Sequence, residues 1–343
     1  MLVLRPTRSP SPYSVSCSPP RGTLLSSLVP TPRRRPLPFV VACAGQPEVR
    51  RICEDDYHST VRSLNSRGRH KPRKSLGQHY MLNSSINEEL VNVAGVGEGD
   101  VVLEIGPGTG ALTNVLINAG AMVVAVEKDP HMALLVQERF NSTDQLLVLQ
   151  EDFTKCHICS HLTSFLEKNH METRPTSAKV VSNLPFNIST EVIKQLLPMG
   201  DIFSDVVLLL QEETASRLAD CSLRTPEYRP INIFVQFYSD PEYKFKVERT
   251  NFFPQPNVDA AIIKFRLKQS AEYPLVTSRK SFFSMISSAF NGKRKMLRNS
   301  LQHISPSDQI EAALSSIGHP VTARPGELTM EDFVNLHNLI AKV

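Results

Sequence analysis

An apolar segment, Val101–Ile105, leads directly into a glycine-rich segment, Gly106–Gly110, and then into residues that favour a helix. This order of strand, glycine turn and helix is typical of open α/β sheets that bind a nucleotide, because backbone N–H groups at such a turn approach the ligand closely. Only glycine readily tolerates the backbone angles that the turn requires. The motif alone leaves the ligand open, since Gly106, Gly108 and Ala111 also satisfy the dinucleotide fingerprint of a dehydrogenase.

Two acidic residues follow the next expected strands, at positions that suit a nucleoside. The segment 121–126 ends in Glu127, where a carboxylate can accept hydrogen bonds from both ribose hydroxyls. The segment 146–150 leads to Asp152, which can accept a hydrogen bond from an adenine amino group. Each acid alone would also suit a helix cap or a solvated loop. Because ligands of open α/β sheets bind outside the carboxyl ends of the strands, these strand ends together predict one nucleotide site.

The fourth expected strand, 179–182, runs into the tetrapeptide Asn-Leu-Pro-Phe, which favours methyl transfer over hydride transfer. The amine of adenine is conjugated with its ring and is a poor nucleophile. If the Asn183 side chain and the Leu184 carbonyl accept its hydrogens, the nitrogen lone pair becomes available for attack. Pro185 stiffens the turn. Phe186 offers a flat face for the base, worth about 1–3 kcal/mol per stacked base.

With the glycine turn, the two acids and this tetrapeptide in order, the chain resembles the small-subunit ribosomal RNA adenine N6,N6-dimethyltransferases of the kasugamycin-resistance type, and specifically their plastid form. The likeness continues through Lys74–Met81, Asn251–Ala260 and the basic segment Ala289–Leu301, and runs to the end of the chain. The sequence departs from the commonest family pattern at Phe186, where tyrosine is frequent, and at His79, where asparagine is also frequent.

The resemblance implies a Rossmann-like class I S-adenosylmethionine-dependent methyltransferase sheet of the α/β class with a small all-helical C-terminal domain. It implies S-adenosylmethionine as cofactor, held at the matching positions His79, Met81, Gly106, Gly108, Glu127, Asp152 and Asn183. It implies a catalytic element made of Asn183, Leu184, Pro185 and Phe186. The implied reaction converts two adjacent adenines near the 3′ end of organellar small-subunit rRNA to N6,N6-dimethyladenosine and contributes to ribosome biogenesis.

A basic segment near the C-terminus is expected to contact the RNA. Residues 273–307 contain no acidic residue but carry six Lys/Arg, which can contact phosphates. The spacing places Lys293, Arg294 and Arg298 on roughly one side of a predicted helix. A solvated helix face is the alternative for such a run of charge. The resemblance adds Phe253 as a candidate second aromatic against the target base.

The chain is expected to contain two folded domains after an N-terminal leader. Residues from about 270 onward lack strand patterns and predict helices over 278–290, 293–303, 307–317 and 329–341. The expected organisation is a transit peptide (1–47), a disordered junction (48–70), a methyltransferase catalytic domain (71–268) and a helical RNA-contacting domain (269–343).

The N-terminal segment predicts an organelle transit peptide, because residues 1–47 contain no Asp or Glu, carry six arginines and are rich in Ser and Pro. The sequence Val41–Ala44 resembles a plastid cleavage site, so we expect the chloroplast stroma, with the mitochondrion as the alternative. Residues 1–75 hold 14 Lys/Arg and 4 Asp/Glu, whereas the remaining residues hold 24 and 30. The net charge of +4 is therefore no argument for a nucleic-acid partner, and any basic binding face must be local.

Several partners are not expected. The longest aliphatic run is Val206–Leu210, whereas a membrane helix needs about 20 apolar residues. Six scattered cysteines do not form a disulfide framework and favour a reducing compartment. No second ligand pair accompanies the possible metal ligands Cys156, His157, Cys159 and His161, so we expect no metal.

The expected partner is small-subunit ribosomal RNA or a pre-ribosomal particle, bound by a monomer. Two alternatives stay open from the sequence. One is a transcription or ribosome-assembly factor of the same fold without catalysis, against which the intact Glu127, Asp152 and Asn183 weigh. The other is an adenine methyltransferase that acts on large-subunit RNA or on DNA.

Overall fold

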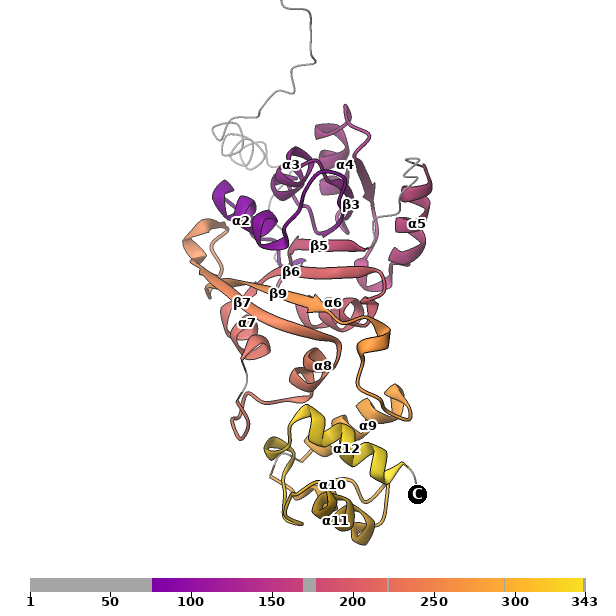
Figure 1. The fold of residues 1–343 in the computed structure, drawn as a ribbon. Coiled ribbons are helices and arrows are strands. Elements are labelled where there is room, and N and C mark those ends of the chain that lie inside the picture. The colour runs from indigo at the N-terminus through magenta and orange to yellow at the C-terminus, as the bar shows by residue number, and fades with distance from the viewer. Residues whose placement is uncertain (1–75, 169–176, 221, 293, 342–343) are drawn as a thin grey trace, which may run out of the picture. The chain divides into compact units, whose positions relative to one another are not determined.

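The structure, a computed structural model, describes residues 76–168, 177–220, 222–292 and 294–341. The described residues belong to one compact unit built around a seven-stranded sheet (Figure 1). The predicted transit peptide and junction lie outside the described residues. None of the described helices is long and apolar enough to cross a membrane.

The central sheet has the strand order β4-β3-β2-β5-β6-β9-β7. Strands β4, β3, β2, β5 and β6 are parallel, whereas β9 runs antiparallel to both of its neighbours. The bounds are β2 Val101–Ile105, β3 Met122–Val126, β4 Leu146–Leu149, β5 Ala178–Asn183, β6 Phe203–Gln211, β7 Ser239–Val247 and β9 Ala260–Leu267. The four strands expected from the sequence are confirmed to within one residue at each end.

Helices cover both faces of the sheet, and further helices follow its last strand toward the C-terminus. The α-helices are α2 Ser84–Ala94, α3 Ala111–Asn118, α4 Pro130–Arg139, α5 Ile158–Lys168, α6 Ser189–Leu196, α7 Glu212–Ala219, α8 Pro230–Tyr238, α9 Arg279–Phe290, α10 Leu297–Ser300, α11 Ser307–Ser316 and α12 Met330–Ile340. A separate two-stranded sheet pairs β1 (Tyr80–Met81) with β8 (Phe252–Phe253).

Strand β2 shows why the sheet is buried on both faces. Val101, Leu103 and Ile105 pack into one hydrophobic core, together with residues of α5 and α6. Val102 packs into a second core, together with residues of α2 and α3. Because side chains alternate between the faces of a strand, a strand covered on both faces reads as a continuous apolar run. The α/β class predicted from that run is confirmed.

The C-terminal helices α9 to α12 share the first of these cores with the sheet. Phe282 of α9 and Phe333 of α12 lie in the same cluster as Phe265 of β9. The rings of Phe282 and Phe237, which belongs to α8, are 5.3 Å apart. The all-helical character of this region is confirmed, whereas a domain boundary between 268 and 269 stays a prediction.

One expected helix is much shorter than the sequence suggests. The helix predicted over 293–303 is represented only by α10, which begins at Leu297. Met296, directly before it, has an extended backbone (φ −67°, ψ 145°), and Leu301 ends the helix with ψ 5°. The helical pattern of the sequence therefore failed because the chain turns before Met296 instead of winding through it, with the Lys295 N–H donating to the Gly292 carbonyl oxygen.

We expect Gly200→Ala to lower the free energy of unfolding by about 2 kcal/mol or more. A Cβ atom at Gly200 would lie 1.9 Å from the main-chain oxygen of Lys268, so the backbone after β9 would have to move. The matched control is Gly97→Ala, since no atom lies within 4 Å of a Cβ there, and its effect should stay within about 0.5 kcal/mol. Urea unfolding of both variants measures the difference, and equal stabilities would contradict the packing described.

Candidate active site

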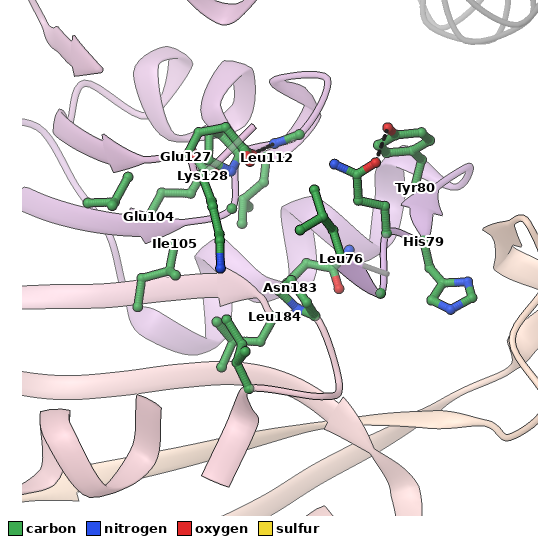
Figure 2. Close-up of a pocket in the computed structure, with 18 of the residues that line it drawn as sticks. Leu76, His79, Tyr80, Glu104, Ile105, Leu112, Glu127, Lys128, Asn183 and Leu184 are labelled. Carbon is green, nitrogen blue, oxygen red and sulfur yellow. Dashed lines mark hydrogen bonds between the residues drawn. The ribbon is translucent and has the colours of Figure 1, made fainter. Parts of the chain in front are cut away.

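A cavity lies at the carboxyl ends of β2, β3, β4 and β5 (Figure 2). Its lining includes every residue that the sequence assigned to cofactor binding or catalysis, namely His79, Met81, Gly106, Gly108, Glu127, Asp152, Asn183, Leu184, Pro185 and Phe186. Phe253, Arg294 and Arg298, which were assigned to RNA, do not line it, and Lys293 lies outside the described residues. The structure thus brings the donor and catalytic sets together, while the role of each residue stays a prediction.

The glycine turn between β2 and α3 forms one wall of the cavity. Gly106 and Gly108 have φ values of 70° and 56°, which L side chains rarely adopt. The Gly108 N–H donates to Oε2 of Glu127 over 3.2 Å, and the Gly106 N–H donates to the Val126 carbonyl oxygen over 2.8 Å. These two bonds fix the turn against the end of β3.

Glu127 is buried at the end of β3, with 5% of its surface exposed. Its carboxylate accepts the N–H of Asp129 over 2.9 Å in addition to that of Gly108. Burial raises the pKa of Glu127, and these main-chain hydrogen bonds partly oppose the rise. The carboxylate is therefore held in one orientation by backbone donors.

Sequence reasoning missed Glu104, a second buried acid that lines the cavity (Figure 2). It is 1% exposed and accepts a hydrogen bond from Oγ1 of Thr113 over 2.6 Å. Burial raises the pKa of Glu104 to about 8, with a smaller contribution from the charge of Glu127. The available signal was an acid inside the otherwise apolar strand β2.

Asp152 follows β4 and caps a short 3-10 helix (Phe153–Lys155). Its Oδ1 accepts the N–H of Thr154 over 3.1 Å and Oγ1 of Thr154 over 2.8 Å. Its Oδ2 lies 2.8 Å from Nζ of Lys128, a cavity residue that sequence reasoning also missed. The hydrogen bond from Lys128 is the main cause that lowers the pKa of Asp152, so this acid is ionised at neutral pH.

Asn183 is the last residue of β5, and its side chain makes no hydrogen bond to another described residue. The turn that begins there is fixed on both sides. Oγ of Ser182 donates to the Ile105 carbonyl oxygen over 2.5 Å, and Oγ of Ser189 donates to the Phe186 carbonyl oxygen over 3.0 Å. The carboxamide of Asn183 is therefore free to bind a ligand, on a turn that is itself held in place.

The paired strands β1 and β8 lie beside the cavity, where Tyr80 is the register partner of Phe253. Nδ1 of His79 is 2.6 Å from the Pro254 carbonyl oxygen, and its ring stacks with that of Phe186 at 5.9 Å and 28°. The His79 side chain thus contacts the segment Asn251–Ala260 while it also lines the cavity, and its assignment to cofactor binding stays a prediction. Phe253 is 40% exposed, and its assignment to the target base stays a prediction.

The basic residues assigned to RNA do not share one helical side. Arg294 is exposed but precedes α10, and Arg298 lies within α10. Nη1 of Arg298 is 2.8 Å from Oε1 of Glu311, so part of its charge is already balanced. Arg294 and its neighbour Lys295 are the exposed cations of this segment among its described residues.

The cysteine and histidine cluster after β4 is partly assembled. Ligand atoms of Glu151, Cys156 and His161 all lie within 4.8 Å of one another. Burial, with the hydrogen bond to Glu151 as a second cause, raises the pKa of the Cys156 thiol to about 12. A protonated thiol is a poor metal ligand. Nε2 of His161 lies 3.3 Å from Oε1 of Glu151, so these two side chains already contact each other.

Comparison with known proteins places these features in one family. The family model described as Ribosomal RNA adenine dimethylase matches residues 69–342. A chloroplastic ribosomal RNA small subunit methyltransferase of Arabidopsis thaliana is 67% identical over 290 residues, 84% of this chain and 84% of the relative. Ribosomal RNA small subunit methyltransferase A of Protochlamydia amoebophila is 35% identical over 267 residues, 78% of this chain and 90% of the relative.

Solved structures share the fold. A dimethyladenosine transferase from Plasmodium falciparum has a TM-score of 0.61 and 24% identity, covering 74% of this chain and 94% of that chain. A 23S rRNA methyltransferase has a TM-score of 0.57 and 22% identity, covering 76% of this chain and 99% of that chain. At these identities the likeness concerns the fold alone.

We expect Glu104→Gln to flatten the pH dependence of stability between about pH 5 and 8. The pKa of Glu104 in the folded protein is about 8, above its ordinary value of 4.5. Between these values the folded state binds the proton more tightly, so the stability of the wild type falls as the pH rises and levels off above pH 8. Glutamine keeps an acceptor for Thr113 but cannot ionise. Urea unfolding at several pH values measures the slopes, and parallel curves would refute a raised pKa at this site.

Proposed function

Because the chain belongs to the ribosomal RNA adenine dimethylase family, we propose that its cavity joins a methyl donor and a target adenine at Asn183. The protein is an S-adenosylmethionine-dependent enzyme that dimethylates N6 of adenines in organellar small-subunit rRNA. The observation that carries the proposal is the position of the tetrapeptide 183–186, which lines the same cavity as Glu127 and Asp152. Two adjacent adenines near the 3′ end are the proposed targets, and their methylation contributes to ribosome biogenesis.

The donor half of the cavity fits S-adenosylmethionine. Glu127, oriented by backbone N–H groups, would accept the ribose hydroxyls, and the ionised Asp152 would accept the adenine amino group. The positive-φ glycines Gly106 and Gly108 leave room for the ligand against the main chain. Met81 and His79 would border its methionine end. When bound, S-adenosylmethionine supplies a methyl group carried on a positively charged sulfur.

The catalytic element would act by positioning the target amine. The oxygen of the Asn183 side chain and the carbonyl oxygen of Leu184 accept the two amine hydrogens, which frees the nitrogen lone pair. Pro185 restricts the turn, and Phe186 stacks against the base. The methylated amine is a strong acid and loses its proton to water, so no general base is needed. Extrusion of the adenine is expected, because its amine is otherwise inaccessible or paired.

RNA contacts are proposed from the aromatic loop and the C-terminal region. Phe253 is exposed beside the cavity and would provide a second aromatic against the target base. Lys293, Arg294 and Arg298 would contact phosphates, with Arg298 shared between RNA and Glu311. The partner is ribosomal RNA, and we propose that it is bound as naked small-subunit RNA or within a pre-ribosomal particle.

The protein acts in the chloroplast, and we place it in the stroma because that compartment contains the ribosomes. We propose that the protein acts as a monomer. The alternative of an assembly or transcription factor without catalysis is disfavoured, because Asn183 keeps its side chain unengaged among the described residues.

We expect Asn183→Ala to lower methylation by about a hundredfold or more while the affinity for S-adenosylhomocysteine changes by less than about threefold. The asparagine acts on the target amine, whereas the acids hold the donor. Primer extension across the 3′ end of plastid small-subunit RNA measures the first quantity, because dimethylated adenines stop reverse transcriptase. Calorimetry measures the second.

The control for this variant is Asn118→Ala, at the exposed end of α3, which should retain full methylation. Equal losses of donor affinity and turnover in Asn183→Ala would contradict the assigned role. If unmodified plastid RNA incubated with the wild type and S-adenosylmethionine gives no stop, the proposed substrate is wrong.

Replacing Lys293, Arg294 and Arg298 with alanine should weaken RNA binding and reduce the slope of log affinity against log salt by about 2. The reduction falls short of three because Glu311 already neutralises part of the Arg298 charge. Glu311→Gln should steepen the slope, since it releases Arg298. Filter binding over a range of salt concentrations tests both variants, and an unaltered slope in the triple variant would remove this segment from the RNA site.

A further inference from the structure

Lys128 joins the ends of two neighbouring strands at the donor side of the cavity. It directly follows Glu127 at the end of β3, and Asp152 follows β4, which pairs in parallel with β3. Its Nζ atom lies 2.8 Å from Oδ2 of Asp152, and both residues line the cavity. Figure 2 shows the Lys128 side chain extended between Glu127 and Ile105.

The hydrogen bonds of Asp152 leave one of its two carboxylate oxygens able to accept a hydrogen bond from a ligand. Oδ1 already accepts the N–H and the hydroxyl of Thr154. Two donors satisfy that oxygen, because a carboxylate oxygen offers about two lone pairs. Oδ2 binds only Lys128 among the donors that the structure describes, so its second lone pair is the acceptor that remains for a ligand. A ligand amino group at Asp152 must therefore bind next to the Lys128 ammonium.

An ordinary surface ion pair is the competing explanation for this contact. The Lys128 side chain is 59% exposed, and exposed pairs contribute little to stability. Asp152 does not need the lysine to complete its capping role, since Thr154 supplies both capping donors. What distinguishes the pair is its position, because Lys128 meets the one carboxylate oxygen of Asp152 that still has a lone pair available for a ligand. The cavity lining contains four acidic residues, Glu104, Glu127, Glu151 and Asp152. Lys128 also lines the cavity, and it pairs with Asp152.

We propose that Lys128 is a positioning residue that holds Oδ2 of Asp152 toward the adenine amino group of the donor and so sets the preference for adenine. The proposal rests on the proposed function, which assigns Asp152 to that amino group. Lys128 fixes the carboxylate rotation from the side opposite Thr154. The same ammonium keeps the acid ionised, as the lowered pKa of Asp152 reflects.

The test is a double-mutant cycle on donor-product affinity. Lys128→Met retains a long apolar stem but removes the ammonium, and Asp152→Asn removes the charge of the acceptor. We expect Lys128→Met to weaken S-adenosylhomocysteine binding about five- to tenfold by calorimetry. In the double variant the loss should be no larger than in Asp152→Asn alone, because a residue that acts through another has no effect once that other is gone. Additive losses would overturn the proposal.

A second ligand separates this proposal from the proposed function. S-inosylhomocysteine carries an oxygen in place of the amino group, so an acceptor at Asp152 disfavours it. The wild type should prefer S-adenosylhomocysteine, and Lys128→Met should lose most of that preference. A wild type that binds neither ligand, or both equally, defeats the assignment of the donor site itself. If the wild type prefers S-adenosylhomocysteine and the Lys128→Met variant retains that preference in full, only the role of Lys128 is wrong.

The matched control is Lys246→Met, which breaks an ion pair of the same length, 2.8 Å to Asp259, outside the cavity. Its lysine side chain is 48% exposed, and its loss should leave the affinity for S-adenosylhomocysteine unchanged. Lys128→Arg should restore most of the affinity, because a guanidinium also donates to a carboxylate. Thermal unfolding of the variants shows that they are folded. A loss of affinity in Lys246→Met equal to that in Lys128→Met would show a general charge effect and overturn the proposal.

Discussion

The parallel alignment of β2, β3, β4 and β5 is the constraint on which the rest of the site depends. Parallel strands end at the same edge, so residues widely separated in the sequence, from Gly106 to Asn183, reach one cavity without any long loop. The alternating cores on the two faces hold the strands in that register. A shift of the pairing by one residue would turn the side chains of the shifted strand to the other face of the sheet.

Two acids at neighbouring strand ends have opposite electrostatic environments. Glu127 is buried among main-chain donors, and burial raises its pKa, whereas Asp152 bonds to a lysine and has a lowered pKa. Glu104, deeper in the cavity, is held with a pKa of about 8. The ionised acid is therefore the more exposed one, and the two acids with raised pKa values are buried.

The local patterns of the sequence predicted four of the seven strands of the sheet and the residues at their carboxyl ends, because hydrophobic runs and strand-end residues follow from neighbours in the chain. His79 and Met81 came from the family resemblance instead. Lys128 escaped that reasoning, since its partner Asp152 is identified only by the pairing of β3 with β4. The contact of His79 with Pro254 joins segments far apart in the sequence and was equally hidden. The prediction of a helix over 293–303 was wrong for the opposite reason. It relied on the local spacing of charged residues, whereas the backbone at Met296 is extended.

The pairing of β1 with β8 has a consequence for how the precursor folds during import. Tyr80 lies near the N-terminal end of the described residues, whereas its register partner Phe253 lies much later in the sequence. If the precursor crosses the plastid envelope with its N-terminus first, β1 enters long before β8. The β1–β8 pair can therefore form only after most of the polypeptide has been delivered.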